Sequence, residues 1–335
     1  MEQKELKPSQ EMRWRKYYPE EALNFDFPKM SIYDVVYEEN RKRKDNIALE
    51  YEDTKIRYGD FFDKVEEKTE YFSSKGIEPG EIVTFTMLMS PEFVYDWYAL
   101  SRIGAISNLI DPRTSVAGIR EYLEEADSKM VLNTGIFTSK VKSAIEDDNI
   151  EVINYSLKDS AKKLPLLLGV VSGITDFTTD LLAKKDIRFQ RYDNSLIKDK
   201  ITTLEQYEPD KPLTIVHTGG TTGTPKGVVL SHDNYNAMAY EYIKSGIGFT
   251  SGDRFLLIMP PWISYGSGML HMSLTCGMKA TIISKLDSKK MPNYILQHQP
   301  QWFAGVPVHY QIVNRSKDIK PGTLSFLKAG AVGGG

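Results

Sequence analysis

The chain has 335 residues, with 42 Lys and Arg, 45 Asp and Glu, and a single cysteine. Charged residues make up 26% of the sequence and hydrophobic residues 41%, which is typical of a globular protein and excludes collagen-like, disordered and disulfide-stapled chains. The net charge of −3 gives no overall positive field, so we expect no nucleic-acid partner. The start of the chain is too charged for a signal peptide, and no run approaches the roughly 20 apolar residues of a spanning helix, so a cytoplasmic location is expected.

Residues 1–30 are polar and aromatic with three prolines, and we expect them to form an N-terminal surface arm. Beyond the arm, strand and helix patterns alternate. Ser31 is the expected N-cap of the first helix, and Gly76 and Gly104 are expected to end two later helices. The expected helices are 31–39, 58–75, 90–104 and 116–126, and the expected strands are 47–51, 55–58, 81–88, 105–110, 130–132, 213–217 and 228–230.

Strands that alternate with helices of this length predict a parallel sheet covered by helices on both faces, so the expected fold class is α/β with layered parallel strands. Residues 156–205 are rich in Lys and Asp and are expected to be an atypical insertion or subdomain connection. They contain an apolar island, LPLLLGVVSGI, at 164–174. We expect this island to pack against the parent domain; a weak peripheral contact with a membrane is the open alternative.

The clearest chemical signal is HTGGTTGTPKGVVLSHDN, His217 to Asn234. A loop of Thr and Gly that ends in Pro-Lys-Gly separates two short apolar strands. Glycines let backbone N–H groups approach an anion, threonine hydroxyls donate hydrogen bonds, and Lys226 adds a positive charge. The loop therefore predicts a polyphosphate site; the alternative, a plain Gly/Thr hairpin turn, does not require nine residues this small.

Two common phosphate loops do not fit this segment. A Walker loop needs Gly-Lys-Ser/Thr before a helix, whereas Lys226 lies between Pro225 and Gly227 and a strand follows. The GxGxxG pattern of dinucleotide-binding folds is absent from the loop. A P-loop phosphotransferase is therefore disfavoured.

TGGTTGTPKGV resembles the Thr-rich phosphate loop TSGTTGxPKG of the adenylate-forming enzymes, which include acyl-CoA synthetases, the adenylation domains of peptide synthetases, and luciferases. The resemblance covers nearly the whole chain from about residue 30. Other segments similar to this family are IRYGDFF at 56–62, RIGAISNLIDPRTS at 102–115, MPPWISYG at 259–266, GVPVHYQ at 305–311 and AGAVGGG at 329–335.

The resemblance implies that the loop holds the β- and γ-phosphates of ATP, with Thr218 near a Mg²⁺ ion. Lys226 would supply charge to the phosphates, and no residue is assigned a catalytic role. The implied nucleotide-binding residues are Thr218, Gly219, Gly220, Thr221, Thr222, Gly223, Thr224, Lys226, Gly333, Gly334 and Gly335. The implied carboxylate pocket consists of Trp262, Tyr265, Gly266, Val306, Pro307 and Tyr310.

The resemblance further implies a reaction in two steps. ATP and a carboxylate give an acyl-adenylate and pyrophosphate, and a thiol, either CoA or the pantetheine of a carrier protein, then takes the acyl group. No Asp or Glu lies between Pro260 and Lys279 to pair a substrate ammonium, and an unpaired buried charge is costly. A fatty or aromatic acid is therefore favoured over an α-amino acid.

The chain stops within the AGAVGGG segment, before the YGxTE segment, hinge and small C-terminal domain of the family. We therefore expect residues 31–335 to be an incomplete large N-terminal domain with little activity alone. A non-catalytic module that binds nucleotide or acyl groups remains an alternative.

The other reactive side chains give weaker signals. The five histidines are scattered without metal-ligand spacing. His271 and His309 are expected to be hydrogen-bonded residues of the core or of a pocket wall. Cys276 lies in an apolar segment and is expected to act as a small buried hydrophobe.

Overall fold

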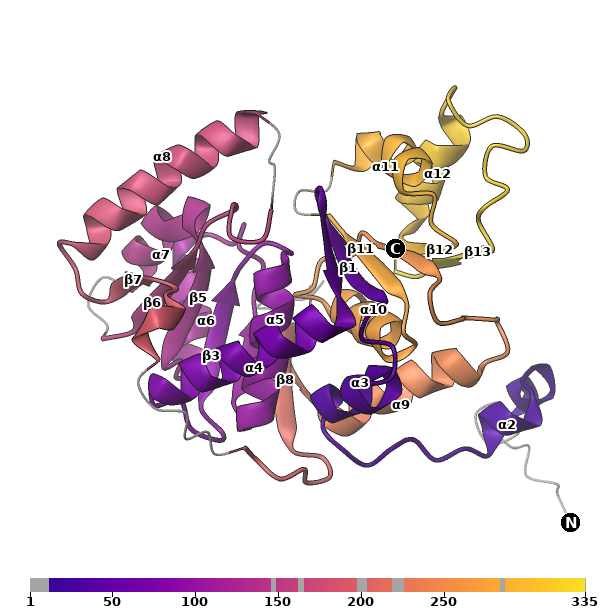
Figure 1. Ribbon diagram of the computed structural model, residues 1–335, viewed down its shortest axis with the longest axis horizontal. Coiled ribbons are helices and arrows are strands. Elements are labelled where there is room, and N and C mark those ends of the chain that lie inside the picture. The colour runs from indigo at the N-terminus through magenta and orange to yellow at the C-terminus, as the bar shows by residue number, and fades with distance from the viewer. Residues whose placement is uncertain are drawn as a thin grey trace, which may run out of the picture.

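The computed structural model describes residues 12–145, 149–161, 166–197, 204–218, 226–283 and 287–334. Within them the strands form two sheets with helices packed around both (Figure 1). One sheet has the order β7-β6-β5-β3-β4-β8-β9 and the other the order β13-β12-β10-β11-β1-β2. All neighbouring strands are parallel except β1–β2 and β8–β9.

The strands of the seven-stranded sheet are β3 (Ile82–Thr86), β4 (Ile106–Leu109), β5 (Met130–Thr134), β6 (Glu151–Tyr155), β7 (Phe189–Arg191), β8 (Pro212–His217) and β9 (Gly227–Ser231). Those of the six-stranded sheet are β1 (Ile47–Tyr51), β2 (Thr54–Arg57), β10 (Arg254–Leu257), β11 (Lys279–Ile282), β12 (Trp302–Gly305) and β13 (Ala329–Val332). The helices are α2 (Glu20–Leu23), α3 (Ile32–Asn40), α4 (Tyr58–Ser74), α5 (Pro91–Ile103), α6 (Val116–Glu125), α7 (Thr138–Ala144), α8 (Leu166–Ala183), α9 (His232–Lys244), α10 (Ser264–Thr275), α11 (Met291–His298) and α12 (Pro307–Arg315).

Local capping signals place the helix ends where the sequence predicts them. The backbone N–H of Asp34 donates to the hydroxyl of Ser31, which caps α3. Gly104 ends α5 with φ of 85°, in the left-handed region that glycine adopts without strain. The expected α/β class with parallel strands is confirmed.

The strands divide between two sheets, whereas the alternation of elements predicts only a parallel sheet. The cause is a pairing between distant segments: β1 lies parallel to β11, with Leu49 opposite Ala280. The N-terminal hairpin β1–β2 therefore completes the sheet built by the last third of the chain. Local patterns carry no information about such a partner.

The expectation that residues 156–205 depart from the alternation is wrong for residues 166–191. There α8 crosses over from β6 to β7, and β7 pairs parallel with β6, with Val152 opposite Phe189. The segment thus adds a regular strand–helix–strand unit at one edge of the seven-stranded sheet. Its three-residue strand is too short to give a readable alternation.

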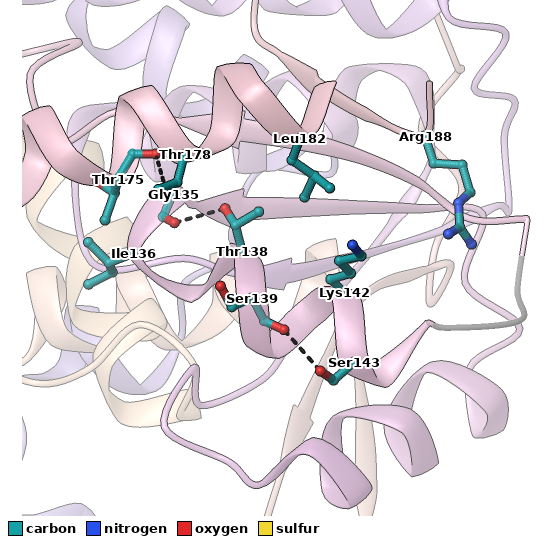
Figure 2. A pocket seen from close by; sticks show the side chains of 10 residues that line it. All are labelled: Gly135, Ile136, Thr138, Ser139, Lys142, Ser143, Thr175, Thr178, Leu182 and Arg188. Carbon is teal, nitrogen blue, oxygen red and sulfur yellow. Dashed lines mark hydrogen bonds between the residues drawn. The ribbon is translucent and has the colours of Figure 1, made fainter. Parts of the chain in front are cut away.

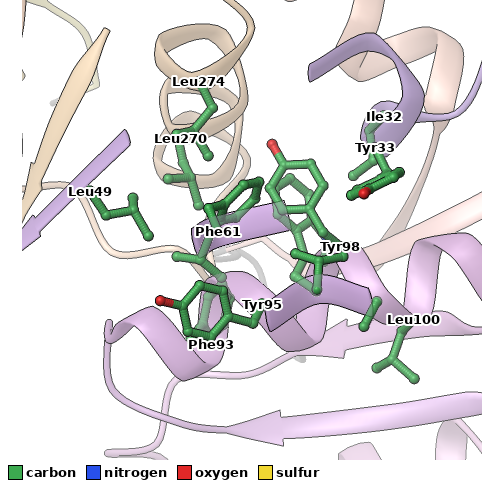
Figure 3. Close-up of a cluster of buried hydrophobic side chains, with 14 of the residues drawn as sticks. Ile32, Tyr33, Leu49, Phe61, Phe93, Tyr95, Tyr98, Leu100, Leu270 and Leu274 are labelled. Carbon is green, nitrogen blue, oxygen red and sulfur yellow. The ribbon is translucent and has the colours of Figure 1, made fainter. Parts of the chain in front are cut away.

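Aromatic and aliphatic side chains from α3, α4, α5 and α10 form the core layer between the sheets (Figure 3). Phe61 on α4 and Tyr98 on α5 are fully buried and meet edge to face, with ring centroids 5.5 Å apart. Leu270 on α10 is equally buried in the same cluster. Because α10 connects β10 to β11, this cluster joins one sheet to the helices of the other.

His271 is fully buried on α10 and is hydrogen-bonded on both ring nitrogens, as expected. The Tyr98 hydroxyl donates to Nδ1 over 3.0 Å, and Nε2–H donates to Oδ1 of Asn236 over 3.0 Å. The Asn236 amide in turn donates to the Met30 carbonyl, which fixes its orientation. Burial, together with a smaller effect of nearby His232, lowers the pKa of His271 to about 3, so the ring is neutral.

Cys276 is partly buried at the end of α10. Burial raises the pKa of its thiol to about 11, and the negative charge of Asp253 acts in the same direction. The thiol therefore stays protonated and poorly nucleophilic, in line with the expected packing role.

Substituting Gly104 tests the junction between α5 and β4. A Cβ there would meet the carboxylate of Glu205, which is held by an ion pair with Lys211. We expect Gly104→Ala to lower the free energy of unfolding by about 3 kcal/mol, measured by urea denaturation, because it combines left-handed strain with a displaced side chain.

The matched control is Gly80→Ala. Gly80 has nearly the same φ, 84°, but nothing lies within 4 Å of a Cβ at that position. We expect this variant to lose only about 1–2 kcal/mol, the cost of the backbone conformation alone. Equal losses for the two variants would show that Glu205 does not constrain residue 104.

The neutral state of His271 predicts a pH dependence of stability. Its pKa in the folded protein lies below the ordinary value of 6.5, so the unfolded chain binds more protons as the pH falls below 6.5. Stability is therefore lost between pH 6.5 and about 3, and His271 accounts for about 2 kcal/mol of the loss between pH 7 and pH 5. In His271→Gln the amide keeps a donor and an acceptor but does not titrate. The difference in the free energy of unfolding between pH 7 and pH 5, measured by urea denaturation, should therefore be smaller by about 2 kcal/mol in this variant. An unchanged pH dependence would contradict the assignment.

Candidate active site

Each of the segments expected to form the site follows the carboxyl end of a strand that has parallel neighbours. Residues 218–226 follow β8, residues 259–266 follow β10, residues 306–310 follow β12, and residues 333–334 follow β13. Ligands of α/β proteins bind beyond the carboxyl ends of the strands. One of these segments therefore begins at the carboxyl end of a strand of the seven-stranded sheet, and the other three begin at the carboxyl ends of strands of the six-stranded sheet.

The base of the Thr/Gly loop is an antiparallel hairpin in which β8 pairs with β9, and His217 lies opposite Gly227. The backbone N–H of Thr218 donates to the Lys226 carbonyl over 3.1 Å, and the Lys226 N–H lies 3.4 Å from the Thr218 hydroxyl. Both residues are exposed. The two expected strands are thus confirmed, and the hairpin fixes the two ends of the loop against each other.

Six of the expected nucleotide-binding residues in this loop lie outside the described residues. They are Gly219, Gly220, Thr221, Thr222, Gly223 and Thr224, and the terminal Gly335 lies outside as well. Of the implied phosphate-binding set, Thr218 and Lys226 are the described members.

Beside the loop base, His217 is held in one tautomer by a polar chain. Asn108 on β4 donates from its amide nitrogen to the Thr84 hydroxyl over 2.9 Å, so its Oδ1 accepts from Nε2–H of His217 over 2.8 Å. Burial lowers the pKa of His217, with an opposing effect of Glu125, so the ring is neutral with Nδ1 as an acceptor. Nδ1 is buried and has no hydrogen-bond partner among the described residues.

Sequence analysis gave no role to His217 or Asn108. A detectable signal existed, since Asn108 and Thr84 are polar residues inside the short strands Ile106–Leu109 and Ile82–Thr86, which are expected to be buried. Both are fully buried, and such residues require hydrogen-bond partners. Which partner each one finds depends on the order of β3, β4 and β8, which the sequence alone does not reveal.

The tyrosines expected in the carboxylate pocket converge on β13. The Tyr310 hydroxyl donates to the Ala331 carbonyl over 2.8 Å, and the Tyr265 hydroxyl lies 3.4 Å from the same oxygen. Burial raises the pKa of Tyr310 far above 10, and it also raises the pKa of Tyr265, so both hydroxyls are protonated donors. The structure therefore brings Tyr265 and Tyr310, from different helices, onto one strand.

The end of β13 lies against the same residues. Gly333 donates its N–H to the Gly305 carbonyl over 3.1 Å, and a Cβ at Gly333 would lie 3.5 Å from the Tyr265 ring. A Cβ at Gly334 would lie 3.5 Å from the Val306 side chain. The segment expected on the adenine side and the pocket residues Tyr265 and Val306 are therefore neighbours.

Trp262 provides a contact between the two sheets. It follows β10 of the six-stranded sheet, and its ring centroid lies 5.8 Å from the guanidinium of Arg113, which follows β4 of the other sheet. Arg113 is oriented by Asp111, with Nη2 and Oδ2 2.6 Å apart. Sequence analysis assigned no role to Arg113, although it lies in the family-like segment 102–115.

Two of the expected pocket residues have local structural roles. Gly266 is buried, and a Cβ there would collide with the Pro260 carbonyl, so glycine is needed for the close approach of the chain. Pro307 is exposed and opens the first turn of α12, where its fixed φ suits a helix start. His309, in the same turn, is buried and accepts a hydrogen bond on Nδ1 from the Val306 N–H over 3.3 Å, as expected of a hydrogen-bonded histidine.

A separate cavity of about 480 Å³ lies beyond the carboxyl end of β5, between α7 and α8 (Figure 2). None of the expected site residues lines it. Its walls carry hydroxyl groups from Thr138, Thr175 and Thr178 together with two cationic side chains, Lys142 and Arg188. It is therefore distinct from the candidate active site.

The comparisons with known proteins agree with this geometry. The chain is 22% identical over 334 residues to a long-chain-fatty-acid–CoA ligase of Bacillus subtilis, which covers 94% of this chain and 57% of the relative. It is 24% identical over 244 residues to a 2-succinylbenzoate–CoA ligase of Bacillus cereus, with 73% of this chain and 42% of that protein aligned. The chain thus spans about half the length of the relatives it matches.

The fold is also similar to that of solved structures. One of them is the crystal structure of the anthranilate CoA ligase AuaEII in complex with anthranoyl-AMP. The match covers 92% of this chain and 56% of the ligase chain, with a TM-score of 0.74 and 18% sequence identity. The family described as AMP-binding enzyme matches residues 36–335. Because that match extends over most of the sequence, the chain belongs to the AMP-binding enzyme family.

Proposed function

We propose that the chain forms the nucleotide- and acyl-binding part of an ATP-dependent acid–thiol ligase. The observation that carries this proposal is the exposed base of the Thr/Gly loop at Thr218 and Lys226, at the carboxyl end of β8. The tyrosine-lined segments after β10, β12 and β13 would accept the acid beside it. The relatives named as CoA ligases support the same class of reaction.

Lys226 is suited to a polyphosphate because it is exposed and sits next to a fixed backbone hydrogen bond. Hydrogen bonds to charged groups contribute about 1.5–3 kcal/mol each, so a few donors suffice for useful affinity. A nucleotide that enters the loop would gain the Lys226 charge without breaking a packed core. The described part of the site is therefore preorganised at its base.

Mg²⁺ would accompany the nucleotide. Among the described residues, no three His, Cys, Asp or Glu side chains gather into a metal site. Mg²⁺ commonly binds through substrate phosphates and needs few protein ligands. Phosphate oxygens would supply most of its ligands here, and the exposed Thr218 hydroxyl would add one from the protein. When bound, the ion would neutralise phosphate charge.

In the proposed first step, a carboxylate oxygen attacks the α-phosphorus of ATP. A new P–O bond forms, the bond to the β-phosphate oxygen breaks, and pyrophosphate leaves. The residues of the chain would hold the two anionic reactants close together and in line, which is the main source of rate in phosphoryl and nucleotidyl transfer. In the second step the sulfur of CoA attacks the acyl carbonyl, AMP leaves, and the thiol proton passes to solvent.

The acid class follows from the charges around the pocket. Helix α10 is buried from Gly266 to Thr275 and contains no acidic residue. Tyr265 and Tyr310 add protonated hydroxyls. This lining suits a fatty or aromatic acid and offers nothing to neutralise an α-ammonium group.

Lys226→Ala tests the phosphate site. We expect it to raise the Kd of MgATP about ten-fold in isothermal titration calorimetry, because one charged donor is lost. The unfolding midpoint should not change, because the side chain is exposed. Lys244→Ala, the same change at the exposed end of α9, should bind MgATP like the parent chain. Unaltered affinity in Lys226→Ala would remove the observation on which the proposal rests.

A pair of acids that differ only in an amino group tests the acid class. We expect 3-phenylpropanoate to support ATP–pyrophosphate exchange at least a hundred-fold better than phenylalanine, because burial of an unpaired ammonium costs several kcal/mol. A preference for phenylalanine would refute the assigned acid class. If MgATP binds and neither acid supports exchange, the chain is a nucleotide-binding module rather than a ligase.

A further inference from the structure

Helix α8 carries its apolar side chains on the outside. Val170, Ile174, Phe177 and Leu181 follow one another at intervals of four, three and four residues, which places them in one stripe along the helix. They are exposed by 53%, 60%, 68% and 45%. In a helix that packs on a core, such a stripe would face inward.

The inward face of the same helix is mainly polar, although Leu182 near its end packs against a hydrophobic cluster. Ser172 and Thr179 are buried. The Ser172 hydroxyl lies 3.1 Å from the Ser156 hydroxyl, and the Thr179 hydroxyl lies 3.4 Å from the Thr138 hydroxyl. Ser156 also donates to Asp176 over 2.9 Å. Turning the helix to bury the stripe would break these contacts, so they fix the orientation of α8.

For the described residues 169–174, this orientation corrects the expectation that the apolar island at 164–174 packs inward. Of its described side chains, Val170, Val171 and Ile174 are exposed. The side chains of residues 166–168 lie outside the description. Figure 1 shows α8 at the upper left, along the outer end of the molecule.

We propose that the stripe formed by Val170, Ile174, Phe177 and Leu181 docks on an anionic lipid surface, with α8 lying in the plane of the membrane interface. Lys184 and Lys185 are exposed and lie in the turn directly after α8 ends at Ala183, so they place positive charge next to the Leu181 end of the stripe. This combination of an apolar face and adjacent lysines is the pattern by which helices bind anionic membranes.

The cavity beside α8 is also lined by positively charged side chains. Lys142 and Arg188 line it, and Thr175 and Thr178 of α8 line its other wall (Figure 2). Asp186 pairs with Arg188, which leaves the Lys142 charge in excess. Positive charge on this side of the helix adds to the attraction for anionic headgroups.

Two other ways to cover the stripe fit less well. No helix in the described ranges is long and apolar enough to cross a membrane, and α8 is anchored to the domain by its polar face. A second copy of the chain would gain only one face of an 18-residue helix. That face is roughly 27 Å by 10 Å, an area of about 270 Å², which is far less than the roughly 800 Å² per partner of a stable dimer. A lipid surface requires no complementary shape.

The test is co-sedimentation with phosphatidylcholine vesicles containing 30% phosphatidylglycerol at low salt. We expect the chain to bind, and the double variant Ile174→Ser, Phe177→Ser to partition about ten-fold less, because two inserted side chains lose their apolar surface. The matched control is Ile247→Ser, Leu204→Ser, which alters two exposed apolar residues elsewhere and should bind like the parent. Lys184→Gln, Lys185→Gln should weaken binding to the anionic vesicles and reduce its salt dependence.

Several results would overturn the proposal. The first is a parent chain that stays in the supernatant. The second is equal partitioning of the Ile174→Ser, Phe177→Ser variant and its control. Self-association that this variant abolishes in sedimentation equilibrium, without vesicle binding, would assign the stripe to a protein contact. A much lower urea midpoint for the variant would show that the two side chains pack inward. No residue of the candidate active site takes part, so the result does not depend on the proposed function.

Discussion

The layer of helices between the two sheets is the contact on which the arrangement of the molecule depends. Phe61 and Tyr98 meet there with side chains of α10, so the helices of one sheet pack directly on the helix that joins two strands of the other. His271 adds hydrogen bonds to α5 and α9 within this layer, and its neutral ring needs no compensating charge. This layer brings the segment after β4 and the segment after β10 into contact with each other through Arg113 and Trp262.

Much of the fold is predictable because its signals are local. Caps such as Ser31 and Gly104 and the alternation of strands and helices depend on residues a few positions apart, and the structure confirms them. The division into two sheets is not predictable in this way, since β1 finds β11 far along the chain. The same limit applies to α8: its sequence is visibly apolar, but the buried hydroxyls that decide which face turns inward lie on other elements.

The candidate site shows a similar division. The Thr/Gly loop is recognisable because its small residues are contiguous, and the structure confirms the hairpin that supports Thr218 and Lys226. The convergence of Tyr265 and Tyr310 on Ala331 joins three segments and could be expected only from the family resemblance. The chain of Thr84, Asn108 and His217 was missed, because it depends on which strands are neighbours and not on sequence spacing.

The outward orientation of the apolar stripe of α8 leaves part of the available burial free energy unused. Fully burying a large apolar side chain stabilises a protein by about 1.5–3 kcal/mol relative to leaving it in water. Because the four side chains of the stripe are each about half exposed, the helix forgoes about 3–7 kcal/mol, a sizeable share of the stability of a typical domain. The hydrogen bond between the Ser172 and Ser156 hydroxyls contributes about 0.5–1.5 kcal/mol, less than the full burial of one such side chain, while the one from Ser156 to the Asp176 carboxylate contributes an amount similar to that burial. A water-exposed face would be as well served by polar side chains at positions 174 and 177. The proposed lipid contact would remove Ile174 and Phe177 from water, and the lysines that follow Leu181 would favour a negatively charged surface.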